Sequence, residues 1–307
     1  MVDTDTFLII LYVMVDALCK SQLPPERRPG PKASLTRSEV LTLAIFGQWA
    51  HFQSEHGFYR YARCHLHAAF PTLPRRTQFN WLLRRHRYAI VAFSLHLVEV
   101  LGARHCPCEA LDGSAVPTLG CQRAWCRLAG FTDIRWSNRL GWYEGFHLLT
   151  AFNPVGVITG CGFAPASTKD QPLAETFFAL RRHPNPRVLS MGRPALGPYV
   201  VDKGVEGKVN HQRWYLCSIA QVICPPKRNS RQPWPKWLRR WLAGIRQIVE
   251  AVYDELHNTF RLSRERPHDL TGFRARLASK VALHNFCIWL NQQLGRPRLA
   301  FADLLDW

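Results

Sequence analysis

The hydrophobic pattern of the chain changes near residue 106, and this change limits the possible folds more than any other feature. Before it, apolar residues recur at the three- and four-residue intervals of amphipathic helices. After it, short runs of apolar, β-branched and aromatic residues alternate with turn residues, which is typical of strands. We therefore expect an all-helical region over residues 1–105 and a second domain with a sheet over residues 106–307.

The first region contains a clear helix start and a basic segment. Thr36 and Glu39 have the spacing of a capping box, so a helix is expected to begin near Thr36. A second helical segment begins at Thr77, beside basic residues that include Arg76 and Arg84. Two interpretations stay open: a helix that contacts DNA through these arginines, or an amphipathic helix whose basic face is solvated.

The second domain alternates strands and helices in an order that predicts a mixed sheet flanked by helices. A hairpin is expected because the turn residues Asn153 and Pro154 separate two apolar runs. The expected elements are a strand, two hairpin strands, a helix, two strands and a long helix: residues 110–111, 145–152, 155–163, 171–183, 199–201, 219–223 and a helix from about 237. The sequence thus predicts an α/β fold.

Basic residues greatly outnumber acidic ones. Forty Lys and Arg residues against 22 Asp and Glu give a formal net charge of +18 at pH 7. A charge of this size favours a polyanionic partner, and nucleic acid first of all. The alternative is that the charge only keeps the protein soluble.

The densest positive charge lies in residues 225–240, which hold six basic residues, four prolines and no acidic residue. The prolines argue against regular structure, while Trp234 and Trp237 offer flat faces for stacking. We expect a DNA-contacting basic loop; the alternative is a surface loop whose tryptophans pack inward. Its candidate DNA contacts are Lys227, Arg228, Arg231 and Trp234.

No apolar run reaches the roughly 18 to 20 residues that span a bilayer. The longest, residues 7–18, contains Asp16 and follows acidic residues, unlike a signal peptide. We therefore expect a cytoplasmic protein without a membrane partner, and mostly reduced cysteines. One group of possible zinc ligands matches no common zinc module, so ordinary thiols are favoured over structural zinc. This group is His105, Cys106, Cys108, Cys121 and Cys126.

Three acidic residues lie at positions in the expected elements that are typical of functional sites. Asp112 and Asp202 each follow an expected strand, at the rim where ligands of α/β folds bind. Glu250 lies on the expected long helix, and Arg246, four residues before it, shares its face. Arg246 can pair with this carboxylate, and it is also a candidate contact to a DNA phosphate. Carboxylates that converge repel one another unless a cation lies between them, and a divalent metal ion is the usual solution. The trio therefore predicts a metal site for phosphoryl chemistry.

Other acidic residues compete for these positions. Asp133 and Asp170 are alternatives to the two aspartates, and Asp254 or Glu255 to the glutamate. Asp170 stands where a helix is expected to begin, so capping and the helix dipole explain it as well.

The three acids stand among further short motifs over residues 34–290. These motifs are Leu111-Asp112-Gly113-Ser114 with Val116-Pro117, Trp142-Tyr143-Glu144-Gly145-Phe146-His147-Leu148, Phe163-Ala164-Pro165-Ala166 with Asp170, Val201-Asp202-Lys203-Gly204, Pro226-Lys227-Arg228-Asn229, Arg246 with Glu250, and Arg266 with Leu270-Thr271-Gly272-Phe273 and Arg276. In this order they resemble the DDE transposases of bacterial insertion sequences.

The resemblance implies an RNase H-like catalytic domain whose catalytic residues are Asp112, Asp202 and Glu250. In that family these acids hold Mg²⁺ or Mn²⁺, with two ions in each active site. The implied reaction is cleavage of DNA at the ends of a mobile element, followed by strand transfer through attack of a DNA 3′-hydroxyl. Lys203, beside the second aspartate, either meets a phosphate oxygen or only solvates the strand end.

The implied partner is double-stranded DNA, both the element ends and the target. Because two ends must be paired, we expect a homodimer on DNA, associated with the bacterial nucleoid in the cytoplasm. Two alternatives remain: a nuclease or resolvase of the same fold that cuts without joining, and an inactive, domesticated DNA-binding derivative.

Four positions depart from the family pattern. Val205 stands where a tyrosine is common, His147 where a lysine is frequent, Leu149 where a histidine is found, and His257 where some relatives have a lysine. None of the four removes an expected metal ligand. The departures affect which residues can contact phosphate, and they put full activity of this chain in question.

Overall fold

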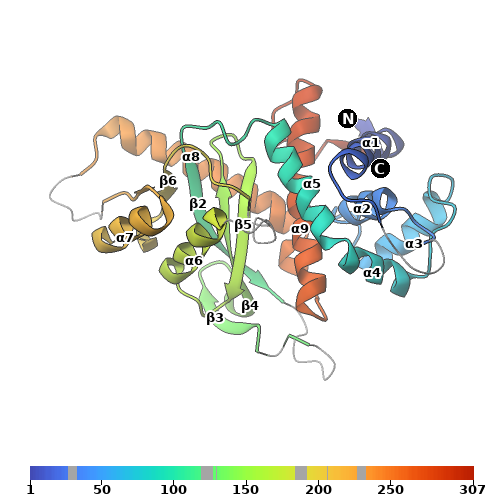
Figure 1. Ribbon diagram of the computed structural model, residues 1–307, viewed down its shortest axis with the longest axis horizontal. Helices are drawn as coiled ribbons and strands as arrows, with labels where there is room; N and C mark the ends of the chain where they lie inside the picture. Colours follow the sequence, from blue (N-terminus) through green and yellow to red (C-terminus); the bar gives the residue numbers. More distant parts are fainter. Residues whose placement is uncertain (27–32, 119–126, 129, 184–191, 206, 227–232) are drawn as a thin grey trace. The chain divides into compact units, whose positions relative to one another are not determined.

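The chain forms mixed α/β structure in two compact units, drawn in Figure 1 from a computed structural model. The structure describes residues 1–26, 33–118, 127–128, 130–183, 192–205, 207–226 and 233–307. The first unit comprises Met1–Leu97, Glu255–Leu262 and Pro267–Trp307, and the second comprises Val98–Asp254 and Ser263–Arg266.

The first unit is helical, as expected for this part of the chain. Its helices are α1 (Thr4–Ser21), α2 (Arg37–Phe46), α3 (Glu55–His65), α4 (Arg76–Arg85), most of α5 (Arg87–Val100) and α9 (Leu270–Gln293). Two short strands, β1 (Val2–Asp3) and β8 (Leu305–Asp306), pair in parallel.

The sequence located two of these helices correctly. Thr36 is the N-cap of α2, where its hydroxyl accepts from the backbone N–H of Glu39 and the Glu39 carboxylate accepts from the backbone N–H of Thr36. These reciprocal bonds confirm the capping box. Helix α4 begins one residue before the expected start and buries Phe79, Leu82 and Leu83, which confirms the second helix.

Helix α1 contains the longest apolar run of the sequence. One side of it, with Phe7, Leu11 and Val15, is fully buried, whereas Ile9 and Val13 are exposed. The pattern is that of an amphipathic helix that packs on a protein core, here against α2. Among the described residues, every helix lacks either the length or the apolarity that crossing a bilayer requires.

Helix α9 forms the centre of the first unit, although the sequence placed it with the second domain. Most of its residues between Phe273 and Asn291 are buried, and it packs against α2 and α4. Its buried Lys280 donates to the side-chain oxygen of Gln48 at 3.0 Å and to the backbone oxygen of Phe260 at 2.6 Å. The closing segment therefore belongs to the helical unit, so the boundary near residue 106 does not separate the two units completely.

The second unit is built on a mixed sheet, as the sequence predicts. The strands are β2 (Glu109–Pro117), β3 (Asp133–Ser137), β4 (Gly141–Phe152), β5 (Ile158–Pro165), β6 (Tyr199–Val201) and β7 (Val222–Ile223). Their order is β3-β4-β2-β6-β7, and β5 pairs with the later part of β4. Strands β2, β3, β4 and β5 pair in antiparallel fashion, whereas β2, β6 and β7 are parallel to one another.

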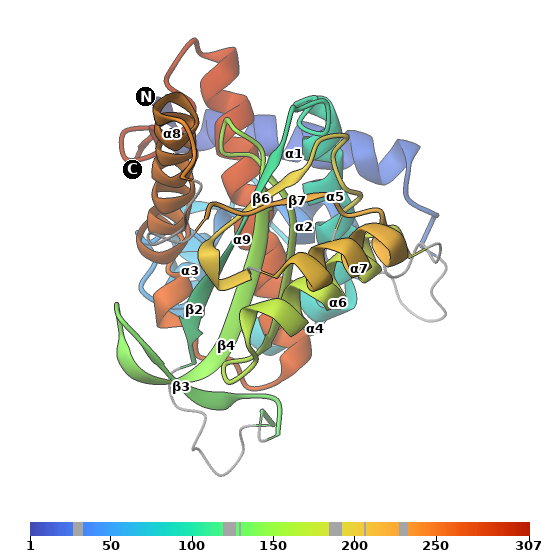
Figure 2. The same cartoon turned by 90° about the vertical axis from the view of Figure 1, so that its left-hand side faces the viewer.

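Helices cover both faces of this sheet. Figure 2 shows α8 (Lys236–Asp254) on one face, and α6 (Asp170–Arg182) with α7 (Lys208–Ser218) on the other. Successive residues of a strand point to opposite faces. Leu111 and Ala151 join the core beneath α6, so Asp112 and its cross-strand partner Thr150 point toward α8, which packs on β2.

Most expected elements of this unit are confirmed. The exceptions are residues 155–157, which precede β5, the expected strand 219–223, and the elements β3 and α7, which were not predicted. The Asn153 side chain accepts backbone N–H groups of Val155 and Val157 and thereby closes the β4–β5 hairpin. The expected strand 219–223 is reduced to β7, because Ile219 is the left-handed C-cap of α7. The sequence did not predict α7, which has no continuous apolar stripe.

Candidate active site

Asp112 and Asp202 are neighbours on adjacent parallel strands. Strand β6 pairs with β2 through Leu111 opposite Val201, so the two aspartates are the next residues along each strand. Asp202 directly follows β6, as predicted. The strand-end prediction for Asp112 was wrong, because β2 continues to Pro117 on its long partner β4. Asp112 still lies at the point where pairing with β6 stops.

The surroundings of Asp112 favour its protonated form. Burial raises the pKa of this carboxyl from 3.8 to about 6, and the carboxylates of Asp202 and Asp170 act in the same direction. A backbone hydrogen bond from Gly113 and the positive charge of Arg246 partly oppose the increase. The two expected catalytic aspartates therefore share one electrostatic environment with a third acid and an arginine.

Helix α8 contacts the backbone or side chain of both aspartates. Arg246 donates to the Asp202 carboxylate, rather than pairing with Glu250 as the sequence led us to expect. The Tyr253 hydroxyl donates to the main-chain oxygen of Asp112 at 2.6 Å. Glu250 lies between them on α8, four residues after Arg246 and three before Tyr253, and its side chain is exposed. These spacings put all three residues on one side of the helix.

The three expected metal ligands are not equally close to one another. The structure brings Asp112 and Asp202 together, while Glu250 extends from the adjoining helix. Within the described part of the chain, no group of three His, Cys, Asp or Glu residues is arranged to hold a metal ion. The donor chemistry nevertheless fits Mg²⁺ or Mn²⁺, because all three ligands are carboxylates. The guanidinium beside Asp202 also indicates that this place accepts positive charge.

Asp170 is the alternative acid that comes near the site. It is the first residue of α6, and its Oδ1 lies 3.3 Å from His147 Nε2 and 3.7 Å from Arg135 Nη2. Arg135 Nη1 lies 2.9 Å from His147 Nδ1 and donates to the backbone oxygen of Thr168. Burial lowers the pKa of His147. His147 Nδ1 also lies 2.9 Å from the backbone oxygen of Thr168, while Nε2 faces Asp170.

The His147–Asp170 pair touches the backbone beside both aspartates. A Cβ atom on Gly113 would lie 2.5 Å from His147 Nε2, and one on Gly204 would lie 2.9 Å from Asp170 Oδ2. The pair thus packs against the residue after Asp112 and the second residue after Asp202. The sequence contained each residue in a motif but gave no sign that they meet, because β4 and α6 bring them together.

The other alternative acids are less involved. Asp133 is exposed on β3, and a hydrogen bond from Ser167 lowers its pKa. Asp254 is exposed at the last residue of α8, and Glu255 begins the π-helical turn Glu255–Thr259 of the first unit.

A buried ion pair anchors the strand that carries Asp112. Arg181 of α6 and Glu109 of β2 are fully buried and form two bonds, Nη1 to Oε2 at 2.8 Å and Nη2 to Oε1 at 3.1 Å. Arg181 also donates to the Tyr199 hydroxyl of β6 at 3.0 Å. One side chain therefore ties together α6, β2 and β6, three residues before Asp112. No pattern in the sequence predicted a buried arginine there.

The expected DNA contacts have different settings. Arg84 pairs with Asp269 at 2.7 Å, and Arg76 lies 3.9 Å from Glu55, both within the first unit. Lys203 belongs to a short 3₁₀ turn after β6, and Trp234 is partly buried just before α8. Three further candidates lie outside the described residues: Lys227, Arg228 and Arg231.

The expected basic loop is shorter than predicted. Residues 236–240 are the first turns of α8, so the irregular structure expected up to residue 240 was wrong there. The physical reason is that a proline hinders a helix only in its interior, and Pro235 precedes the first helical residue.

Three of the four positions that depart from the transposase pattern are core residues. Leu149 and Val205 belong to the hydrophobic core beneath α6, and His257 is buried in the first unit. The fourth, His147, lies with Nε2 3.3 Å from Asp170 Oδ1.

The structure describes only part of the candidate zinc group. Cys106 and Cys108 carry free thiols, and burial raises the pKa of Cys106 to about 11. Cys121 and Cys126 lie outside the described residues.

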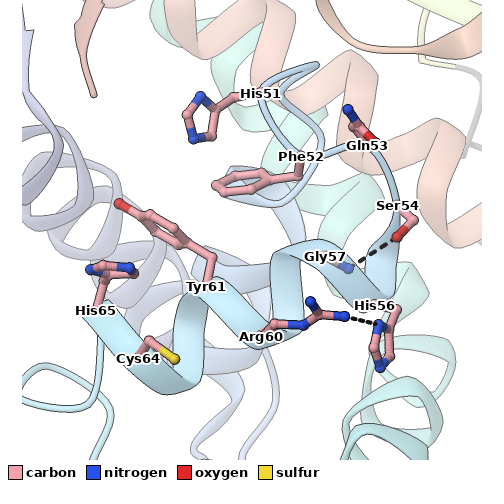
Figure 3. A pocket seen from close by; sticks show the side chains of 10 residues that line it. All are labelled: His51, Phe52, Gln53, Ser54, His56, Gly57, Arg60, Tyr61, Cys64 and His65. Carbon is pink, nitrogen blue, oxygen red and sulfur yellow. Dashed lines mark hydrogen bonds between the residues drawn. The ribbon is translucent and has the colours of Figure 1, made fainter.

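A pocket of about 520 Å³ lies in the first unit, along α3 and the loop before it. Figure 3 shows aromatic and cationic side chains around it, with Arg60 donating to His56 Nδ1 at 3.2 Å. Its lining contains no carboxylate and none of the expected site residues: His51, Phe52, Gln53, Ser54, His56, Gly57, Arg60, Tyr61, Cys64 and His65.

Comparison with family models, with curated proteins and with solved structures gave no match for this chain.

Proposed function

We propose that the protein is a DNA transposase of the DDE type, which cleaves DNA at the ends of a mobile element and joins the 3′-hydroxyl ends to a target. One observation carries the proposal. Asp112 and Asp202 are adjacent on parallel strands, and α8 contacts both of them through Arg246 and Tyr253, which flank Glu250. The order of the acids along the chain is the one that the resemblance requires.

The fold supports this proposal at the level of topology. The strand with the first aspartate lies at the centre of the sheet, between antiparallel neighbours on one side and parallel neighbours on the other. Helices cover both faces. This arrangement is compatible with an RNase H-like domain.

In the proposed enzyme, Asp112, Asp202 and Glu250 would hold two Mg²⁺ or Mn²⁺ ions. Such ions, when bound, activate the attacking oxygen and stabilise the leaving oxygen of a phosphodiester. Arg246 offsets the charge of Asp202 and offers a guanidinium to a phosphate oxygen. Tyr253 holds the Asp112 backbone in place from the adjoining helix.

The net charge of +18 supports double-stranded DNA as the partner. Pairing of two element ends requires two active sites, so the proposed working form is a homodimer on DNA. In a bacterial cell this form would be associated with the nucleoid in the cytoplasm.

The test combines the purified protein, Mg²⁺, DNA with the inverted repeats that flank the coding gene, and a target plasmid. Joined products support the transposase, nicks without joining favour a nuclease or resolvase, and binding alone favours an inactive derivative. The variants Asp112→Asn, Asp202→Asn and Glu250→Gln should lose cleavage at least 100-fold, on the order expected when a metal ligand is lost, and keep DNA affinity. Asp133→Asn, on an exposed part of β3, is the matched control. Full activity of Asp112→Asn would contradict the site.

A further inference from the structure

The first half of α8 presents a large exposed surface. Residues 236–244 are all exposed or partly exposed, whereas burial begins at Ile245. Trp237 is 69% exposed and Trp241 is 39% exposed. In Figure 1 these first turns extend beyond the sheet, while the later turns pass behind it. Exposed aromatic side chains become candidates for nucleic-acid binding when basic residues accompany them.

The charge of this surface identifies the kind of partner. Lys236, Arg239 and Arg240 are exposed next to the tryptophans, and the first acidic residue of α8 is Glu250. An anionic partner therefore gains charge complementarity along the whole half-helix.

The surface leads directly to the candidate active site. Positions 236, 239, 243, 246 and 250 recur every three or four residues, so Lys236, Arg239, Arg246 and Glu250 follow one side of α8. Arg246 already contacts Asp202. An anionic chain bound along the first half of the helix is thus continuous with the two aspartates.

The tryptophans distinguish single strands from duplexes. Trp237 and Trp241 are one helical turn apart, about 6 Å along the axis, which is nearly two nucleotide steps of about 3.4 Å. Bases in a duplex are stacked on one another, whereas unpaired bases have faces free to stack on aromatic rings. Cations that follow the phosphates, together with aromatic rings that hold bases, are typical of single-strand binding.

We propose that residues 236–244 of α8 bind an unpaired stretch of DNA beside the active site, with Trp237 and Trp241 stacked on bases and Lys236, Arg239 and Arg240 at phosphates. The inference rests on the proposed function for its location, because the strand bound there is the one opened next to the cleavage point.

The test measures binding without catalysis. A labelled 12-nucleotide thymidine strand, and a blunt duplex whose strands are of the same length, are titrated with the full-length protein in EDTA, and affinity is read from fluorescence anisotropy. Trp237→Ala and Trp241→Ala should each weaken single-strand binding about 5- to 100-fold, with a much smaller effect on the duplex. Trp237→Phe should restore most of the affinity, because a ring remains. Lys236→Gln should reduce the slope of log affinity against log salt by about 0.7.

Trp142→Ala is the matched control, because Trp142 is 72% exposed on β4 of the same unit. It should leave single-strand affinity unchanged. Wild-type single-strand affinity in a Trp237→Ala/Trp241→Ala variant that keeps its circular dichroism would overturn the inference. An equal loss for strand and duplex would overturn it too, because general charge attraction would then suffice. Since no metal ion is present, these outcomes are independent of whether the protein cleaves DNA.

Discussion

At the scale of single residues, the ionisation of Asp112 opposes folding. Its pKa in the folded protein, about 6, exceeds the ordinary value of 3.8, so the folded state binds the proton more tightly than the unfolded state. The stability that the group contributes is fully present below pH 3.8 and is lost as the pH rises through about 6. An uncharged isostere avoids this loss.

Asp112→Asn is therefore expected to raise the free energy of unfolding at pH 7.5 in EDTA by roughly 1–3 kcal/mol. The difference from the wild type should disappear near pH 4. Urea denaturation at the two pH values measures both quantities. Equal stability of the two proteins at pH 7.5 would show that the charged Asp112 carboxylate does not destabilise the folded state.

Asp170 is expected to influence turnover of the proposed enzyme through the two strands that carry the candidate catalytic aspartates. Its contacts with His147 and with the Gly204 backbone hold these segments at a fixed separation. Asp170→Asn should reduce the DNA cleavage rate about tenfold or more, since small displacements of catalytic groups have large effects on rate. DNA affinity should not change. Single-turnover kinetics and a binding titration separate the two.

Glu175→Gln on the same helix is the control for Asp170→Asn, because the Glu175 carboxylate forms an exposed ion pair with Arg213. This change should leave both rate and affinity as they are. If Asp170→Asn cleaves at the wild-type rate, the pair has no positioning role.

The Glu109–Arg181 pair gives a second stability prediction. Arg181→Met leaves the Glu109 carboxylate buried without its partner, which should cost about 3–5 kcal/mol. A double variant with Glu109→Leu should recover much of this loss, because no charge then stays buried. Arg213→Met removes an exposed pair and should cost less than about 1 kcal/mol. Urea midpoints measure all three, and a small effect of Arg181→Met would contradict the assigned burial.

At the scale of elements, two glycines differ in the space that they leave for a side chain. A Cβ atom on Gly145 of β4 would lie 2.1 Å from the backbone oxygen of Val116, which has no room to move within the sheet. A Cβ atom on Gly244 of α8 would meet nothing within 4 Å. The same substitution thus disturbs a strand pair in one case and improves helix propensity in the other.

Gly145→Ala is expected to destabilise the protein by about 2 kcal/mol or more, as overpacking does. Gly244→Ala should stabilise it by about 0.5–1 kcal/mol, because glycine is a poor residue in helices. Thermal unfolding of the two variants beside the wild type measures the difference. Shifts of the same sign would refute this account of the two environments.

The sequence predicted local elements well and long-range neighbours poorly. The capping box at Thr36 and the turn at Asn153 are decided by residues within a few positions, and both are confirmed. Helix α7 was missed because its sequence lacks an apolar stripe. The partner of Arg246 was predicted incorrectly, because a helical spacing cannot show that Asp202 lies across from it.

The candidate site was predictable in its residues but not in its arrangement. Asp112 and Asp202 were recognisable from the strands before them, yet their adjacency depends on the β2–β6 register across a long stretch of chain. The contact between His147 and Asp170 depends on where β4 and α6 meet, which no local pattern records.

At the scale of the whole molecule, the first unit depends on both ends of the described chain. Phe7 of α1 and Phe286 of α9 are fully buried, and their rings meet edge to face with centroids 5.1 Å apart. Phe286→Ala should destabilise this unit by about 3–5 kcal/mol. Hydrogen exchange should then become faster in residues 1–97, with little change in residues 98–254.

Leu294→Ala, an exposed change beyond the end of α9, is the control and should leave exchange unaltered. Faster exchange confined to α9 in the Phe286→Ala variant would mean that α1 and α2 do not depend on it.

The composition of the two units determines the order in which a growing chain can complete them. Residues 98–266 leave the ribosome before α9 is made, so every strand of the large sheet and all of α8 are available while the helical unit still lacks its central helix. Domains made early usually fold first during synthesis. Here α2 and α4 are made before α9, the helix that they pack against, so their contacts with it can form only after the sheet-containing unit has been made.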